Sequence, residues 1–340
     1  MRKRSSSVTI RDVAKKAGVS VATVSRYINR NAPVSAEVAK RVKNVMAELR
    51  YVPHAAARNL ASRKNRVIGL LLNNLHNDFF VPLLNGVEGV VRKMGYNLIV
   101  ATYHADSRNE MSPPIGPHNT DGILVFSDGL MDKELINLNE TGFPMVLVHR
   151  TPPLSTNIPS VTVENVEITK KLIEHLIRVH GKQRILFLRG PIHQEDSVSR
   201  ETGYKYALEE NGIPYNENLI LNGEFERDIS FNVMNEFLDN GHRVDFDAVF
   251  AGDDDAAIGV LRSLQKHGIN VPSDVAVVGF DDLGFAPFLN PPLTTVRAPT
   301  EEVGRIATEK LFKLLGDQPS NEVMILPTEI IFRRSCGCMV

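Results

Sequence analysis

From residue 67 onward, short apolar runs alternate with longer amphipathic stretches, and this alternation restricts the possible folds more than any other feature of the chain. VIGLLL at 67–72 and RILFLRG at 184–190 are apolar runs, and ENVEITKKLIEHLIRVHG at 164–181 is an amphipathic stretch. Continuous apolar strands between amphipathic helices are typical of parallel sheets that helices cover on both faces. The pattern predicts an α/β fold with two sheets, because it repeats after residue 160.

The first 66 residues differ from the rest of the chain in charge. They hold 16 Lys and Arg residues against three acidic residues, a net charge of +13, whereas the remainder carries −14. This density of one sign in a short segment indicates a polyanionic partner for that segment alone. A solvated basic surface is the simpler alternative.

Three helical patterns follow one another in the basic segment. Apolar residues fall at helical spacing in 10–17, in 21–29 and in 36–50. Thr9, three residues before Asp12, forms a capping-box pattern at the start of the first helix. Two short helices joined by a glycine-containing turn, with a third helix after them, predict a helix-turn-helix domain.

The second of these helices carries residues suited to base recognition. Val21 and Ala22 offer apolar contacts to thymine methyl groups, and the guanidinium of Arg26 can donate two hydrogen bonds to guanine. Small polar side chains that suit phosphate oxygens are Thr9, Ser20, Thr23, Ser25 and Asn29. A helical bundle with a basic surface is the alternative, but a solvated helix face would normally be polar at Val21 and Ala22.

VTIRDVAKKAGVSVATVSRYIN at 8–29, followed by APVSAEVAKRVKNVMAELRYVPHAAARNLAS at 32–62, resembles the DNA-binding head of the LacI/GalR repressor family. The Val21–Ala22 pair is similar to the galactose-repressor subgroup of that family. The resemblance implies a DNA-binding head at 1–52 in which Val21, Ala22 and Arg26 read bases. The residues that it implies for contacts with the DNA backbone are Thr9, Ser20, Thr23, Ser25, Asn29, Ser35 and Tyr51.

Residues 53–66 are expected to form a hinge or linker. Pro53 ends the preceding helix, and HAAARNLAS is long enough for about two helical turns, too few to be stable alone in water. The resemblance implies a hinge helix that pairs with its copy in a dimer and inserts Leu60 into the minor groove. Beside Leu60 it implies contacts from His54, Ala57 and Arg58. Without the resemblance, an ordinary flexible tether is the preferred interpretation.

The order of the later segments resembles the periplasmic-binding-protein-like core of the same family, and VPSDVAVVGFDD followed by PPLTTVRAP is its most specific part. The resemblance implies a two-lobed core at 67–340 with a Rossmann-like parallel sheet in each lobe. Chain crossovers would put the first lobe at about 67–160 plus 292–325 and the second at about 161–291 plus 326–340. A ligand is expected between the lobes, at the carboxyl ends of the strands.

Polar residues follow several of the predicted strands, where such a ligand would lie. Carboxylates accept hydrogen bonds from paired sugar hydroxyls, and arginine donates from a fixed fork. The ligand positions of the family fall on Asn73, Phe79, Phe80, His149, Asp196, Arg200, Asp253 and Asp281. His149 replaces an acid that is common in the family, and Asp253 stands where an asparagine is common. In the run 253–255 we expect one aspartate to cap a helix and another to bind the ligand.

One segment departs from the family pattern. Between about 106 and 120 the family normally has a helix, whereas this chain has Pro113 and Pro114, which cannot continue one. The sequence predicts a mostly irregular loop there, near the rim of the cleft.

The sequence contains no set of residues with the pattern of a catalytic or metal site. It has no G-x-S-x-G, H-E-x-x-H, P-loop or G-x-G-x-x-G motif. Cys336 and Cys338 are two thiols in a terminal tail, and a zinc site needs further ligands. We therefore expect no enzymatic activity, no cofactor and no metal.

A solute-binding protein of sugar transport is an alternative, since the core alone would allow it. The basic head argues against this alternative, as does the start MRKRSSSVTI, which lacks the apolar stretch of a secretory signal. Two cysteines are typical of a reducing cytoplasm, and no apolar run approaches the ~18 residues of a membrane helix. A cytoplasmic protein with no membrane partner is expected.

The predicted function is a ligand-controlled transcriptional repressor. As the family implies, a homodimer would read a pseudo-palindromic DNA operator with one head on each half-site. The expected small-molecule effector is an inducing sugar, and a purine or another corepressor is the alternative. No leucine heptads follow the core, so a dimer is expected rather than a tetramer.

Overall fold

The computed structural model describes residues 8–29, 32–51, 65–75, 78–103, 113–241, 246–318 and 321–339. The chain divides into two compact units, Met1–Arg66 and Val67–Val340, each with its own core. No helix in the described ranges is both long enough and apolar enough to span a bilayer.

The first unit contains three helices, as the sequence predicts: α1 (Ile10–Ala17), α2 (Val21–Asn29) and α3 (Ala36–Glu48). Their buried apolar core consists of Val13, Ala14, Ala17, Val24, Val42 and Val45. These residues recur at the helical spacing that the sequence shows, so one face of each helix turns inward.

The predicted helix ends of this unit are confirmed. The Asp12 carboxylate accepts hydrogen bonds from the backbone N–H of Thr9, at 2.8 Å, and from its hydroxyl, at 2.7 Å. Gly18 ends α1 in the left-handed conformation at φ 64°, which a residue without a side chain adopts at little cost. The Ser20 Oγ accepts from the Thr23 N–H at 3.1 Å at the start of α2.

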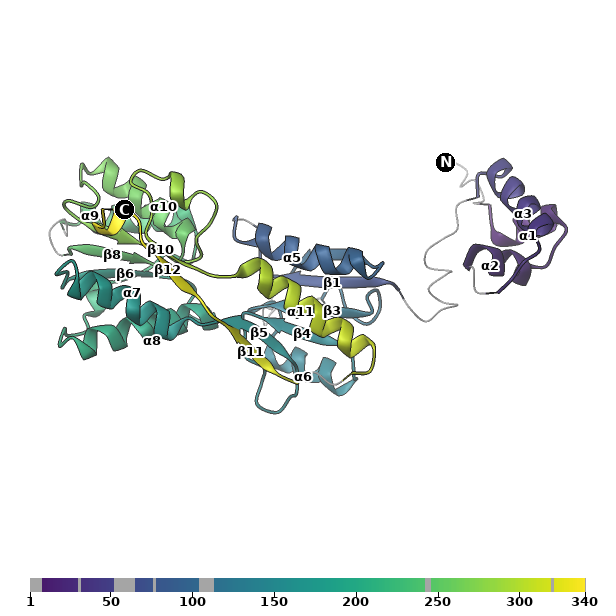
Figure 1. Cartoon of the computed structure of the whole chain (residues 1–340), viewed down its shortest axis with the longest axis horizontal. Helices are drawn as coiled ribbons and strands as arrows, with labels where there is room; N and C mark the ends of the chain where they lie inside the picture. Colours follow the sequence, from purple (N-terminus) through teal and green to yellow (C-terminus); the bar gives the residue numbers. More distant parts are fainter. Residues whose placement is uncertain are drawn as a thin grey trace, which may run out of the picture. The chain divides into compact units, whose positions relative to one another are not determined.

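The second unit begins with a six-stranded parallel sheet (Figure 1). Its order is β11-β5-β4-β3-β1-β2, and the strands are β1 (Val67–Leu72), β2 (Asn97–Thr102), β3 (Gly122–Phe126), β4 (Met145–Val148), β5 (Ser160–Val163) and β11 (Val323–Leu326). Alternate residues of one strand enter different cores: Leu70 and Leu72 face one cluster and Leu71 faces the other. Both faces of the sheet are therefore buried, which explains its continuous apolar runs.

Helices α5 (Phe80–Lys93) and α11 (Thr300–Leu315) pack together on one face of this sheet (Figure 1). Gly86 and Gly304 lie at their contact, and a Cβ atom on Gly86 would come within 2.0 Å of the Glu301 carbonyl oxygen. Helix α6 (Asp132–Glu140) covers the opposite face through the buried Leu135.

A four-stranded parallel sheet forms the second lobe, in the order β7-β6-β8-β9. Its strands are β6 (Ile185–Arg189), β7 (Ile220–Asn222), β8 (Ala248–Ala251) and β9 (Ala276–Val278). Helices α7 (Val166–Arg178) and α8 (Glu195–Glu210) pack on one face, and α9 (Arg227–Asp239) and α10 (Asp254–Lys266) pack on the other. The two-lobed α/β core is the predicted one.

The described chain passes between the lobes after β5, after β10 and after β11. Strand β5 carries the first sheet to Val163, a little beyond the crossover expected near 160. Strand β10 (Thr295–Arg297) pairs antiparallel with β12 (Glu329–Ile331), and a bridge joins Thr294 to Val278 of β9. Figure 1 shows β12 and β11 along one continuous path between the two sheets.

The segment with the intruding prolines has no helix or strand in its described part, 113–120, where the chain forms bends and turns. Ile115 anchors this stretch in the core, and the Asn119 carboxamide accepts from the Gly116 N–H at 3.0 Å. The rest of the predicted irregular loop, 106–112, lies outside the described residues.

Candidate DNA-binding face and ligand cavity

One side of α2 exposes the residues expected to read bases. Val21 is 42% exposed, and Ala22 and Arg26 are also exposed, whereas Val24 is fully buried on the inner side. The combination of apolar contacts and a free guanidinium is chemically suited to the major-groove edges of base pairs. Asn29 ends the same helix, and its side chain lies outside the described part.

The residues expected to touch phosphates have partners of their own. The hydroxyls of Ser20 and Thr23 form a hydrogen bond with each other at 2.8 Å, and the Thr9 hydroxyl donates to Asp12. Ser35 Oγ accepts from the Val38 N–H at 3.4 Å at the start of α3, so its hydrogen stays free to donate. These hydroxyls therefore take part in helix caps. Thr9, Ser20 and Ser35 are also exposed to solvent, so a phosphate group can contact them.

The other predicted DNA-contact residues fall into two groups. Tyr51 is half-buried against the core of the head, and Ser25 is half-buried on α2. Those of the hinge lie outside the described residues: His54, Ala57, Arg58 and Leu60.

A cavity of about 310 Å³ lies between the two lobes, lined from both sides. Seven of the eight predicted ligand residues line it: Asn73, Phe79, Phe80, Asp196, Arg200, Asp253 and Asp281. The cavity forms where β1, β6, β8 and β9 end, because the carboxyl ends of parallel strands meet at one edge of each sheet.

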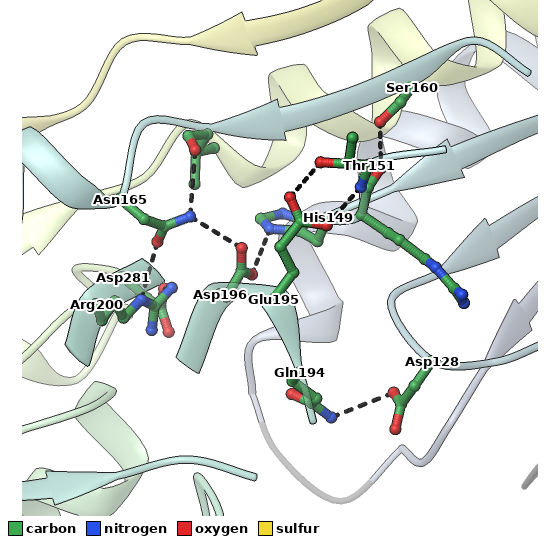
Figure 2. Close-up of polar contacts among 12 residues, drawn as sticks. Asp128, His149, Thr151, Ser160, Asn165, Gln194, Glu195, Asp196, Arg200 and Asp281 are labelled. Atoms are coloured by element: carbon green, nitrogen blue, oxygen red, sulfur yellow. Dashed lines mark hydrogen bonds and ion pairs between the residues drawn. The ribbon is translucent and has the colours of Figure 1, made fainter. Parts of the chain in front are cut away.

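Arg200 is the central cation of this cavity and is only 3% exposed. Its Nε donates to the Asn165 carboxamide oxygen at 3.0 Å (Figure 2), and its Nη1 donates to the Gly252 carbonyl at 2.6 Å. The guanidinium also lies 3.6 Å from the centre of the Phe280 ring. These contacts fix the orientation of the fork before any ligand arrives.

Buried carboxylates surround this guanidinium. Asp281 Oδ1 lies 3.4 Å from Arg200 Nη2, and burial raises the pKa of Asp281 although Arg200 opposes the shift. Burial, and next the charge of Asp281, raises the pKa of Asp253 well above its usual value. Burial would also raise the pKa of Asp196, but His149 and Arg200 hold it below the usual value. The cavity thus holds more acidic groups than its single buried guanidinium can balance.

The three consecutive aspartates have separate tasks. Asp253 caps α10 by accepting from the Ala256 N–H at 2.7 Å, and it is also the member of the run that lines the cavity. Asp254 accepts from the Thr295 hydroxyl at 2.6 Å, and Asp255 pairs with Arg227 at 2.5 Å. The sequence suggested that one aspartate caps the helix and another binds the ligand. In the structure, Asp253 both caps the helix and lines the cavity.

His149 is the predicted ligand residue that does not line the cavity. Its side chain is fully buried behind Asp196, with Nδ1 2.8 Å from the Asp196 Oδ2. The ring packs against Phe79 and Phe126, with centroids 5.6 and 5.5 Å away. Direct contact of His149 with a ligand therefore stays a prediction, which its burial outside the cavity lining does not support. His149 instead holds a carboxylate that lines the cavity, and no protein group in the described chain bonds to its Nε2.

Beside the cavity, the two lobes are joined by contacts that the sequence does not predict. Asp128, just after β3, accepts from the Gln194 side-chain amide at 3.3 Å and lies 3.0 Å from His193 Nε2. Glu195, the first residue of α8, accepts from the backbone N–H of Thr151 at 2.6 Å (Figure 2). The polar run HQED at 193–196, directly after an apolar strand, was the available signal for these contacts.

Comparison with known proteins agrees with this geometry in both units. Residues 9–54 match the family described as bacterial regulatory proteins, lacI family, and residues 173–336 match the periplasmic binding protein-like domain. The chain is 31% identical over 334 residues to the catabolite control protein A of Priestia megaterium. The aligned region covers 96% of this chain and 99% of that protein. The chain belongs to the lacI family.

Solved structures of the lacI family have the same fold. The complex of the transcriptional regulator CelR with cellobiose has a TM-score of 0.69 at 31% identity, over 96% of this chain and 99% of that one. The lac repressor dimer bound to operator and the anti-inducer ONPF has a TM-score of 0.78 at 26% identity, over 97% of this chain and 99% of that one. This lacI-family chain is thus a DNA-binding transcriptional regulator with a small-molecule-binding core.

Proposed function

We propose that this chain is a repressor whose binding to a pseudo-palindromic operator, as a homodimer, is controlled by a neutral sugar in the cavity between the lobes. The observation that carries the proposal is the cavity of about 310 Å³, in which buried carboxylates and one fixed guanidinium face a space bounded by aromatic rings. Hydroxyl pairs of a sugar can donate to such carboxylates and accept from such a fork.

The charge of the cavity lining favours a neutral ligand over an anionic one. Six acidic residues line the cavity against one arginine and one histidine; the acids are Asp128, Asp196, Glu224, Glu226, Asp253 and Asp281. A phosphorylated sugar or a nucleotide would bring further negative charge to this lining, which like charges oppose. The CelR–cellobiose complex is a sugar complex in the same family, which supports the same ligand class.

The proposed division of the chain is a DNA-binding head at 1–52, a hinge at 53–66 and a core at 67–340. In the head, Val21, Ala22 and Arg26 read bases. Backbone contacts come from Thr9, Ser20, Thr23, Ser25, Asn29, Ser35 and Tyr51. In the hinge, Leu60 enters the minor groove with His54, Ala57 and Arg58 beside it. The lac repressor structure, a dimer on operator, supports this arrangement.

The proposed role is regulatory and not catalytic. Three carboxylates of the cavity, Asp281, Asp196 and Asp253, are bound to Arg200, to His149 and to the start of α10, as in a recognition site. Among the described lining residues, no nucleophile is paired with a base. A regulator of this kind acts in the cytoplasm, where its DNA is.

Isothermal titration of the full-length protein tests the ligand class. We expect binding by a neutral mono- or disaccharide, and none by the corresponding sugar phosphate or by purine bases. Asp281→Asn should abolish that binding and the effect of the sugar on operator affinity, while operator affinity itself is unchanged. Asp228→Asn, an exposed carboxylate of α9 in the same lobe, is the matched control and should bind sugar normally.

Two results would contradict the proposal. Tight binding of a purine base or a sugar phosphate with no neutral sugar bound would show that the charge argument fails. An unchanged sugar titration in Asp281→Asn would show that the ligand sits elsewhere.

A further inference from the structure

Two histidines and two cysteines that are far apart in the sequence meet in the second lobe. His175 lies in the last turn of α7, His180 lies in the turn that follows it, and Cys336 and Cys338 lie in the C-terminal tail. One ligand atom from each of the four lies within 4.8 Å of all the others. The further ligands that the cysteine pair lacks in the sequence are therefore supplied by another element of the fold.

Four of the six distances among these atoms lie close to the edges of a coordination tetrahedron. Zinc bonds of about 2.0–2.1 Å to nitrogen and about 2.3 Å to sulfur, at tetrahedral angles, separate the ligand atoms by about 3.3 Å for N–N and 3.6 Å for N–S pairs. The Nε2 atoms of His175 and His180 are 3.1 Å apart. The Cys338 Sγ lies 3.4 Å from His175 Nε2 and 3.5 Å from His180 Nε2, and the Cys336 Sγ lies 3.9 Å from His175 Nε2.

The local backbone brings both thiols to the same side. Gly337, between the cysteines, has a φ of 106°, which a residue with a side chain rarely adopts. A Cβ atom at this position would also lie 3.2 Å from His180 Nδ1, so glycine leaves room for the imidazole.

The tail is fixed in place by its own hydrogen bonds. The Ser335 hydroxyl donates to the Val277 carbonyl at 2.6 Å and accepts from the Thr294 N–H at 2.8 Å. The thiol next to it is therefore held at a defined position against the second sheet, and Cys336 is 1% exposed.

We propose that His175, His180, Cys336 and Cys338 bind one zinc ion and that this ion fastens the C-terminal tail to α7. Two thiolates and two neutral imidazoles balance the charge of Zn²⁺, and four protein ligands leave no open position. The site is therefore structural. It holds the end of the chain against the second lobe, just after β12 has crossed from the first.

The metal content of the full-length, untagged protein tests this assignment. Protein purified under reducing conditions from zinc-containing medium should carry one zinc ion per chain by mass spectrometry of its metals. Cys338→Ser and His180→Ala should each reduce this content to near zero. The control is His118→Ala, which removes an exposed histidine of the first lobe and should retain the ion.

Cobalt replacement gives a readout that does not depend on the variants folding. The wild-type protein loaded with Co²⁺ should show the intense visible bands of a tetrahedral site and a near-ultraviolet thiolate-to-cobalt band. A chelator should lower the unfolding temperature of the wild type but not that of Cys338→Ser, because metal binding adds to the free energy of folding. A disulfide between Cys336 and Cys338 in the reduced preparation, an octahedral cobalt spectrum or full zinc content in Cys338→Ser would each overturn the proposal.

Discussion

At the scale of single residues, the cavity depends on one guanidinium shared among several buried acceptors. Arg200 is bound to Asn165 and to the Gly252 carbonyl and lies beside Asp281. Asp253 accepts the capping hydrogen bond from the Ala256 N–H but forms no ion pair with any residue that the structure describes. Buried carboxylates without a full counter-charge lower the free energy of unfolding of the ligand-free protein. The same carboxylates can accept hydrogen bonds from the hydroxyls of a ligand.

This arrangement predicts that Asp253→Asn stabilises the unliganded protein. Asparagine preserves the helix cap, since it accepts the same N–H, but it removes the buried charge. The folded-state pKa of Asp253 lies well above the usual 3.8, so the folded state keeps a proton that the unfolded chain releases. The wild type therefore loses stability as the pH rises above about 4.

The measurement for Asp253→Asn is the unfolding temperature of both proteins between pH 5 and pH 8. The advantage of the variant should grow with pH over this range. A difference that is constant with pH, or that shrinks, would show that the pKa of Asp253 is not raised in the folded protein.

The exposed face of α2 predicts the behaviour of Arg26→Ala. Loss of a bidentate contact with guanine costs about 1–3 kcal/mol, so operator affinity should fall by roughly 5–150-fold while binding to random DNA changes little. Arg41→Ala removes one exposed charge from α3 and is the charge-matched control. Fluorescence anisotropy with operator and with scrambled duplex distinguishes these effects. Equal losses on both duplexes would assign Arg26 to phosphate contact.

At the scale of elements, the contact between α5 and α11 depends on glycine. A side chain at Gly86 would overlap the backbone of α11, whereas nothing lies within 4 Å of a Cβ at Gly89, one turn later. Gly86→Ala should destabilise the core by about 1–3 kcal/mol through forced separation of the helices. Gly89→Ala should be neutral or stabilising by up to about 1 kcal/mol, because alanine favours helix. Urea unfolding monitored by circular dichroism compares the two, and similar stabilities would mean that the helices separate freely.

The sequence predicts most elements well where apolar periodicity is strong. The three helices of the head and strands such as β1 and β3 have nearly the predicted bounds. Helix α8 begins at Glu195, at the polar run 193–196, where no apolar periodicity indicates a helix start. Glu195 and Asp196 are held by Thr151 and His149 of the first lobe, and such tertiary contacts leave no periodic signal.

Shorter elements escaped prediction for related reasons. Helix α6 buries only Leu135 fully, so its apolar stripe is narrow, and β7 has three residues with half-buried or exposed side chains. Strand β5 was divided by the boundary placed at residue 160. The metal-ligand set was also missed, because its two halves are about 155 residues apart and only the fold joins them.

At the scale of the whole molecule, the cavity could be located from the sequence only through a family resemblance. The strand ends identify Asp253 and Asp281, but periodicity does not reveal that Asp128 of one lobe faces Gln194 of the other. It also does not distinguish His149, which lies behind the cavity, from the residues that line it.

The proposed homodimer predicts the mass of the protein in solution. Sedimentation of the full-length protein at micromolar concentration should give twice the chain mass, both with and without operator DNA. Two heads on one two-fold axis are needed to read a pseudo-palindrome. A tetramer, or a monomer that remains monomeric on operator, would contradict the proposed assembly.

The position of β11 and β12 has a consequence for synthesis of the protein. Val323–Leu326 forms an edge of the first sheet and Glu329–Ile331 pairs beside the second, so β11 and β12, which follow all the other strands in the chain, belong to different lobes. The DNA-binding head precedes the core in the chain and has a core of its own, whereas the two lobes are not both complete until β11 and β12 have been translated. A message broken before the codons for β11 would therefore yield a head able to approach DNA on a core unable to sense its effector.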